Sequence, residues 1–118
     1  MKVVNLNEIA PDWSGGDIFV GKVARQSLVT EAMAGTLRLA AITFSPGART
    51  KLHTHTHDQI LYCIAGKGIL ATEHERYVVT PGMAVYVPPG ERHTHGATED
   101  SFFTHLSITT QGRSEIVE

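Results

Sequence analysis

Residues Gly47–Gly66 read GARTKLHTHTHDQILYCIAG, and His53, His55 and His57 stand at alternate positions in the middle of this stretch. Successive side chains of a β-strand point to opposite faces, so residues two apart share a face. If that face is the inside of a barrel, His53 and His55 present two imidazoles to one point. The pattern favours a metal site to which one strand contributes two ligands.

The residues after His55 indicate a break in that strand. Asp58 and the threonines before it are compatible with a turn. We therefore expect the strand to end near His55 and the next strand to begin near Gln59. His57 would then lie at the rim, in contact with solvent or with the edge of a substrate rather than with a metal.

The rest of the chain has the pattern of an all-β protein. From Leu37 onward, short runs rich in Val, Ile, Leu, Tyr and Thr alternate with turn segments such as SPGA, GKG and PGM. This is typical of a sandwich or barrel. A chain of 118 residues suits one domain. We expect an N-terminal arm over about residues 1–36, a barrel over about residues 37–110, and a short polar tail, QGRSEIVE. Within the arm, Ser27–Gly35 is expected to be a loop or a single turn.

A second group of histidines follows. His93 and His95 stand two apart in PPGERHTHGA, and His105 lies in FFTHLSI, where alternation puts Phe103, His105 and Ser107 on one face. An isolated pair of this kind is more often solvated, or hydrogen-bonded in a core, than bound to a metal. Here the glycines and prolines around both pairs favour the metal site.

Two motifs carry a resemblance to a known family. Gly47-x5-His53-x-His55-x3-Gln59-x6-Gly66 is followed, after 15 residues, by Gly82-x5-Pro88-x-Gly90-x2-His93. These resemble the two signature motifs of the cupin superfamily, at the separation of its small single-domain members. The resemblance implies a double-stranded β-helix, or jelly-roll, barrel. It implies four metal ligands: His53, His55, Gln59 and His93.

Two departures narrow the resemblance. Gln59 stands where the first motif usually has glutamate, and Ala97 where asparagine often closes the second. Both, with SPGARTKLHTH, PPGERHTHGA and THLSI, resemble small bacterial cupins with three His and one Gln around the metal, some of which are manganese-dependent hydroxynitrile lyases. In that group the histidines at the positions of His95 and His105 line the metal-bound substrate. We expect one divalent ion, manganese or iron. Zinc or nickel could replace it during overproduction, because the affinity order of divalent metals favours them.

The donor set and the extra histidines suggest the chemistry. Three imidazoles and an amide are neutral, so a bound divalent ion keeps its charge of about +2 and is a strong Lewis acid. His105 and His95 are the candidate catalytic residues, because histidine titrates near neutrality. His105 could instead orient a ligand or a water, and His95, beside a Gly turn, could lie at the rim. A hydroxynitrile lyase-like C–C lyase is expected. A cupin dioxygenase or isomerase and a non-catalytic binding cupin are the alternatives.

The composition and charge of the chain limit the partners it is expected to bind. The formal net charge is −2, so no extended basic surface for nucleic acid is expected. Cys63 is the single cysteine, and MKVVNLNEIAPDW lacks the apolar stretch of a signal peptide. We expect a cytoplasmic protein that binds a small-molecule substrate and no membrane. The resemblance also implies a homodimer, with Ile18–Val23 as the strand lent to the partner.

Overall fold

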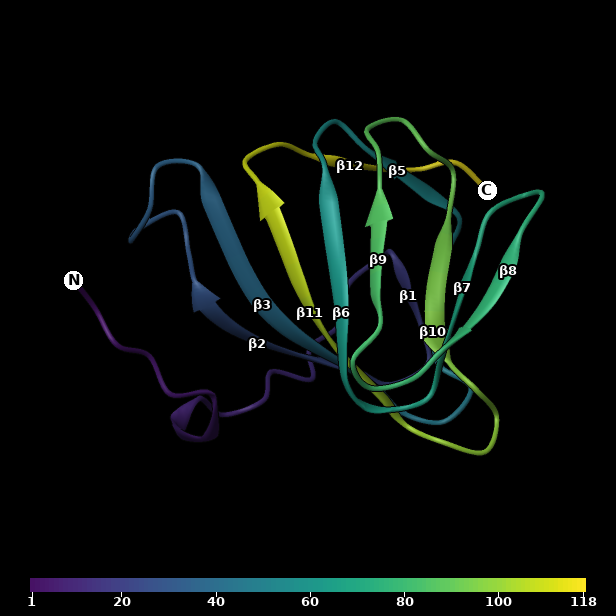
Figure 1. Ribbon diagram of the computed structural model, residues 1–118, viewed down its shortest axis with the longest axis horizontal. Helices are drawn as coiled ribbons and strands as arrows, with labels where there is room; N and C mark the ends of the chain where they lie inside the picture. Colours follow the sequence, from purple (N-terminus) through teal and green to yellow (C-terminus); the bar gives the residue numbers. More distant parts are fainter.

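The computed structural model describes residues 1–118 as twelve strands and one short 3-10 helix. Two five-stranded antiparallel sheets lie opposite each other (Figure 1). The larger sheet has the order β2 (Val23–Val29), β3 (Leu37–Phe44), β11 (Phe103–Thr110), β6 (Gln59–Gly66) and β9 (Ala84–Val87). The smaller sheet has the order β1 (Phe19–Val20), β4 (Arg49–Thr50), β10 (Thr94–Ala97), β7 (Gly68–Ala71) and β8 (Arg76–Val79). The all-β prediction is confirmed, and the arrangement fits a jelly-roll.

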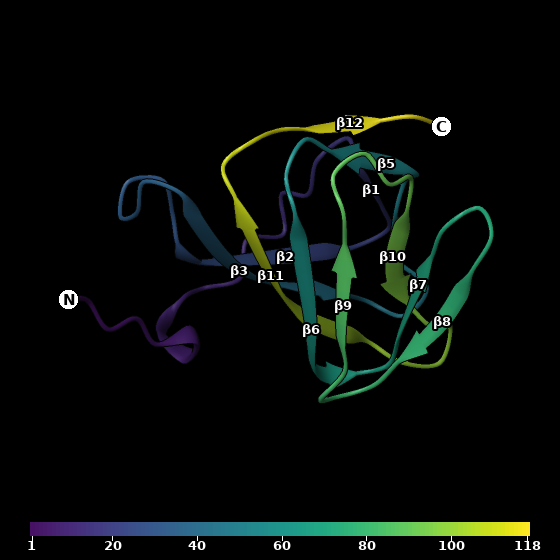
Figure 2. The same cartoon turned by 45° about the horizontal axis from the view of Figure 1, so that its top comes forward.

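A third, two-stranded sheet lies across one end of the molecule. It pairs β5 (His53–His55) with β12 (Ser114–Ile116), and Figure 2 shows these two strands lying over the ends of the two five-stranded sheets. The break expected after His55 is present, because β6 begins at Gln59. The strand that carries two histidines is therefore held by the C-terminal segment of the chain.

The apolar core fills the space between the two sheets. Phe44 and Phe103 are fully buried and their rings stack with centroids 6.1 Å apart. Gly68 lies against the Phe103 ring, and a Cβ at this position would meet that ring at 2.5 Å, so the close approach requires glycine. Phe44 also contacts His95 and His105, with ring centroids 5.6 and 5.9 Å apart. The aromatic core thus forms the floor beneath these two histidines.

The sheets extend beyond the expected barrel of residues 37–110. The interpretation of Ser27–Gly35 as a loop was wrong at its beginning, since β2 runs to Val29 and pairs with β3. The remaining residues form the turn between these strands, and the 3-10 helix Leu6–Glu8 precedes them in the N-terminal segment. The tail also differs from a simple polar end, because β12 pairs with β5. In both places the strand is stabilised by hydrogen bonds to a partner strand, and the local composition does not indicate that pairing.

No helix of the structure has the length and apolar character needed to cross a membrane.

Candidate metal centre

Three of the predicted ligands converge at the end of the sandwich that β5 and β12 cover. The ligand atoms of His53, His55 and His93 all lie within 4.8 Å of one another, and the three side chains are buried. Alternation along β5 brings His53 and His55 to the same face. His93 joins them because its backbone exchanges two 3.1 Å hydrogen bonds with His53.

Each of these imidazoles uses Nδ1 on a partner that lies away from the cluster. His53 Nδ1–H donates to the Lys51 carbonyl at 2.8 Å, and His93 Nδ1–H donates to the Glu91 carbonyl at 2.9 Å. A carbonyl only accepts, so the proton of each neutral ring is on Nδ1 and the lone pair is on Nε2. His55 Nδ1 lies 2.6 Å from the Ser114 hydroxyl, which holds that ring in the same orientation. Partners of this kind fix the tautomer of metal-binding histidines.

Gln59 completes a set of four unpartnered atoms. Its amide Nε2 donates to the Ser107 hydroxyl at 3.0 Å, which turns Oε1 away from that residue. Four buried side-chain polar atoms lack a hydrogen-bond partner in the chain: His53 Nε2, His55 Nε2, His93 Nε2 and Gln59 Oε1. Leaving one such atom unsatisfied costs about 1–3 kcal/mol. These atoms are the ones that a metal would use, so the residues present fit a divalent ion with nitrogen and oxygen ligands.

Burial keeps the three imidazoles neutral, which is the form that binds a metal. Burial, with the neighbouring His93, lowers the pKa of His53 to about 4. Burial and the nearby imidazoles lower the pKa of His55 to about 3, and burial lowers that of His93. Protons therefore compete little for these nitrogens at neutral pH.

His95 and His105 form a second, deeper pair beside this cluster. His105 Nδ1–H donates to the Leu106 carbonyl at 3.1 Å, so His105 Nε2 must accept. His95 Nδ1 lies 3.2 Å from that atom and is the donor, which leaves His95 Nε2 with the free lone pair. Burial lowers the pKa of His105 to about 4 and that of His95 well below its usual value. The alternative that places His95 at the rim is wrong, because its side chain is buried and its backbone N–H donates to the buried Thr50 hydroxyl.

A cavity of about 360 Å³ opens onto both groups of histidines. Its volume suits a small organic molecule. The residues that line it come from β1 to β6, β10, β11, β12 and the two residues before β1: Asp17, Ile18, Phe19, Arg25, Ile42, Thr50, His53, His55, Gln59, His95, His105, Ser107, Ser114 and Ile116. Sequence reasoning missed Arg25 and Ser114. Only Ser107 carried a signal, because it shares a face with His105.

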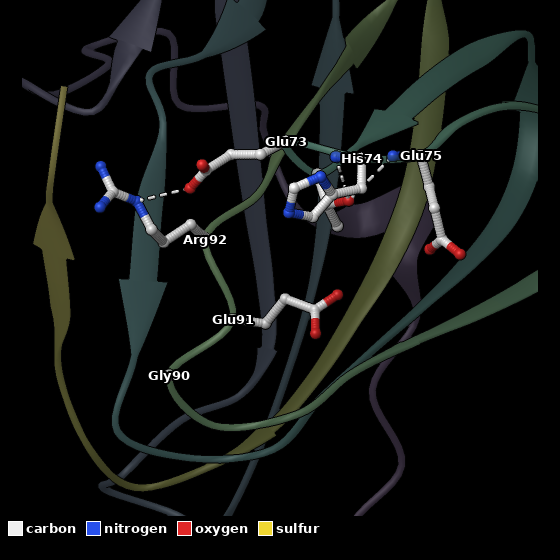
Figure 3. A pocket seen from close by; sticks show the side chains of 7 residues that line it. Glu73, His74, Glu75, Gly90, Glu91 and Arg92 are labelled. Carbon is white, nitrogen blue, oxygen red and sulfur yellow. Dashed lines mark hydrogen bonds and ion pairs between the residues drawn. The ribbon is translucent and has the colours of Figure 1, made fainter.

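The two remaining histidines lie apart from the cavity. His57 is half-buried and stacks on His55 with ring centroids 4.9 Å apart, as expected for a residue at the rim. Figure 3 shows His74 in a second hollow, between the β7–β8 turn and the loop before β10. Arg92 there pairs with Glu73 at 3.1 Å, and the carboxylates of Glu75 and Glu91 spread apart. This hollow therefore offers no converging donor set.

Comparison with known proteins agrees with the fold. A family model described as a cupin domain matches residues 40–109, more than half of the chain. The chain belongs to the cupin family.

Individual relatives extend this result. The cupin is 35% identical over 109 residues, or 92% of its length, to an (R)-mandelonitrile lyase of Granulicella tundricola, of which it covers 83%. A cupin-like protein of Thermotoga maritima superposes with a TM-score of 0.82 at 33% identity, over 88% of this chain and 82% of that one. The polyketide cyclase RemF of Streptomyces resistomycificus has a TM-score of 0.89 over 100% of this chain and 86% of its own, but at 20% identity it shows the fold alone.

Proposed function

We propose that this cupin is a metal-dependent lyase that cleaves the C–C bond next to the hydroxyl of a small molecule, as in a cyanohydrin. The observation that carries the proposal is the set of four buried, unpartnered ligand atoms beside the His95–His105 pair. The similarity to a mandelonitrile lyase over most of the chain supports this reaction class. Manganese or iron is the proposed ion, held by His53, His55, Gln59 and His93.

A divalent ion at these four residues would supply a Lewis acid that makes a substrate hydroxyl more acidic. The chain's own contribution is the base. His95 Nε2 takes the hydroxyl proton, because it is the nitrogen of the pair that carries a free lone pair. The carbonyl then forms as the C–C bond breaks, and cyanide leaves with the electrons of that bond. The His95 ring returns its proton to cyanide, and hydrogen cyanide and the aldehyde are the products.

His105 assists this proton transfer through its hydrogen bond to His95. Its Nε2 accepts from His95 Nδ1–H, so a positive charge that develops on the His95 ring is shared along a hydrogen bond. The contact with Phe44 and the complete burial of His105 keep water from that side. His105 is accordingly a positioning residue in this proposal, and His95 is the catalytic base.

The test is aldehyde release from mandelonitrile by protein that has been stripped of metal and reloaded separately with manganese, iron or zinc. We expect release that depends on the metal and disappears in His53→Ala. No release above that variant with any metal would contradict the proposal. Oxygen uptake with small enolic and carboxylated compounds would then test the dioxygenase alternative.

A separate observation supports a proposal for the assembly state. Within the predicted donor segment Ile18–Val23, Phe19–Val20 already pairs with β4 of the same chain, yet β1 is the edge strand of its sheet. The outward face of β6 also exposes Ile60, Tyr62 and Ile64. We propose a homodimer that covers these groups, and light scattering of the purified protein measures its mass. The cytoplasmic location stays a prediction.

A further inference from the structure

Arg25 lies on the inner face of the larger sheet, at the mouth of the metal cavity. In the strand register Arg25 stands opposite Ile42, and Ile42 stands opposite His105. Directly paired residues of neighbouring strands point to the same face. Ile42 and His105 are buried inside, and all three residues line the cavity of about 360 Å³. The guanidinium therefore belongs to the wall of the site rather than to the outer surface of the sheet.

The guanidinium of Arg25 has no partner within the chain. The chain forms four side-chain ion pairs, and they involve Arg38, Arg49, Lys67 and Arg92. Arg25 takes part in none of them. Asp12 is joined to Arg25 through the backbone, and hydrogen bonds from Ser14 and, to a lesser extent, the Arg25 charge lower the pKa of the Asp12 carboxyl. That carboxylate accepts a 2.9 Å hydrogen bond from the Ser14 N–H and forms no ion pair with Arg25. The planar guanidinium of Arg25, with its N–H donors, is thus available to a ligand at the entrance to the cavity.

The charges around the cavity favour an anion. The three histidines and Gln59 are neutral, so they do not offset the charge of a divalent ion. Arg25 adds a further positive charge, and it is close enough to the imidazole of His105 to help to lower its pKa. The exposed Asp17 is the one acidic residue that lines the cavity. With a divalent ion bound, this site would be a positive region on a chain whose formal net charge is −2.

From this placement we infer that the substrate of the site is a small 2-hydroxy carboxylate, whose carboxylate is bound by the guanidinium of Arg25. Guanidinium and carboxylate match in a planar, two-point geometry. The inference rests on the proposed function, because the hydroxyl is the group on which His95 acts. In such a substrate the C2–C3 bond would break. The hydroxyl proton passes to His95, the carbonyl forms at C2, and C3 leaves with the electrons of the bond and takes the proton back from His95, so C3 must carry an electron-withdrawing group. The products would be a 2-oxo acid and the protonated C3 fragment, and a cyanohydrin is the smaller case in which cyanide is the leaving group.

The test compares two probes of nearly the same shape, one an anion and the other neutral. Mandelate and mandelamide are titrated by calorimetry into the manganese-loaded protein and into Arg25→Gln, Arg25→Lys and Arg38→Gln. Arg38 is the matched control, since it lies on the neighbouring strand, pairs with Glu31 and does not line the metal cavity. Circular dichroism checks that each variant is folded, which is expected because Arg25 is exposed.

We expect Arg25→Gln to weaken mandelate binding about tenfold or more, as for the loss of a charge-assisted two-point contact. Mandelamide binding should change by less than about twofold. Arg25→Lys should bind mandelate with an affinity between those of the wild type and Arg25→Gln, because lysine keeps the charge but lacks the planar pair of N–H donors. Arg38→Gln should leave both probes unaffected.

Two results would overturn the inference: mandelate that binds no better than mandelamide, or mandelate binding that Arg25→Gln leaves unchanged. Failure of the lyase proposal is distinguishable. Arg25-dependent binding of mandelate by protein that releases no aldehyde from mandelonitrile contradicts the lyase alone. Aldehyde release without Arg25-dependent binding of mandelate contradicts only the inference that Arg25 binds a substrate carboxylate.

Discussion

Replacing Ser114 with alanine should weaken metal binding while leaving the fold intact. The Ser114 hydroxyl is the side-chain partner of His55 Nδ1, at 2.6 Å, on a ring that is buried. Without it, Nδ1 of this buried ring loses its side-chain hydrogen-bond partner, and the ring is no longer held in the tautomer and orientation that turn Nε2 toward the centre. Loss of such a partner typically costs about 10- to 100-fold in metal affinity, equivalent to about 1.4–2.8 kcal/mol.

The position of Ser114 allows this effect to be separated from unfolding. β12 is held to β5 by backbone pairing at three positions, and Val117 N–H also donates to the Leu52 carbonyl at 2.9 Å. The C-terminal strand should therefore stay in place in Ser114→Ala, with an unfolding temperature of the metal-free protein close to that of the wild type.

The assay is competition for manganese and for zinc against a chromophoric chelator. Ser114→Thr restores a hydroxyl and should recover most of the affinity. Ser101→Ala is the matched control, because that hydroxyl donates to the Phe102 carbonyl away from the cavity. An affinity of Ser114→Ala within about twofold of the wild type would refute the reasoning, since it falls below the range expected for a partner that fixes a ligand.

Three further predictions concern other residues of the site. Gln59→Glu should bind the metal more tightly but release aldehyde more slowly, because the carboxylate offsets part of the ion's charge; equal rates in the two proteins would count against a Lewis-acid role. His95→Gln should lower kcat for aldehyde release by about 10²- to 10⁴-fold with little change in metal affinity, and unchanged kcat would remove His95 as the base. The metal-free protein should lose stability below pH 6.5, because the folded pKa values of His53 and His105 are about 4 and the unfolded chain takes up protons that the folded chain excludes. Each of these histidines contributes up to about 1.4 kcal/mol per pH unit between pH 6.5 and its folded pKa, and urea unfolding at pH 7.5 and pH 5 measures the difference; equal stability at both would contradict the burial argument.

The alternation of His53 and His55 was enough to predict that they share a face, because strand periodicity is local. Gln59 and His93 were predicted as ligands from the spacing of the family motifs and not from periodicity. The four unpartnered atoms now give a physical reason for that prediction. Ser114 was beyond this kind of reasoning. Its contact with His55 depends on a strand pairing across 59 positions, which nothing in QGRSEIVE indicates. Arg25 was missed in the same way, since its face is fixed by its register with β3.

The burial that makes the site reactive also makes it costly for the fold. His95 and His105 rest on Phe44, and this apolar floor holds both rings neutral, so that a free lone pair is present at the pH where a base is needed. The four unpartnered atoms nearby lower the stability of the metal-free chain, because each has lost water without gaining a partner. A bound ion would satisfy all four at once. Metal binding should therefore stabilise the fold and assemble the site in one step, and the stacked Phe44–Phe103 pair helps to keep the metal-free chain folded until that ion arrives.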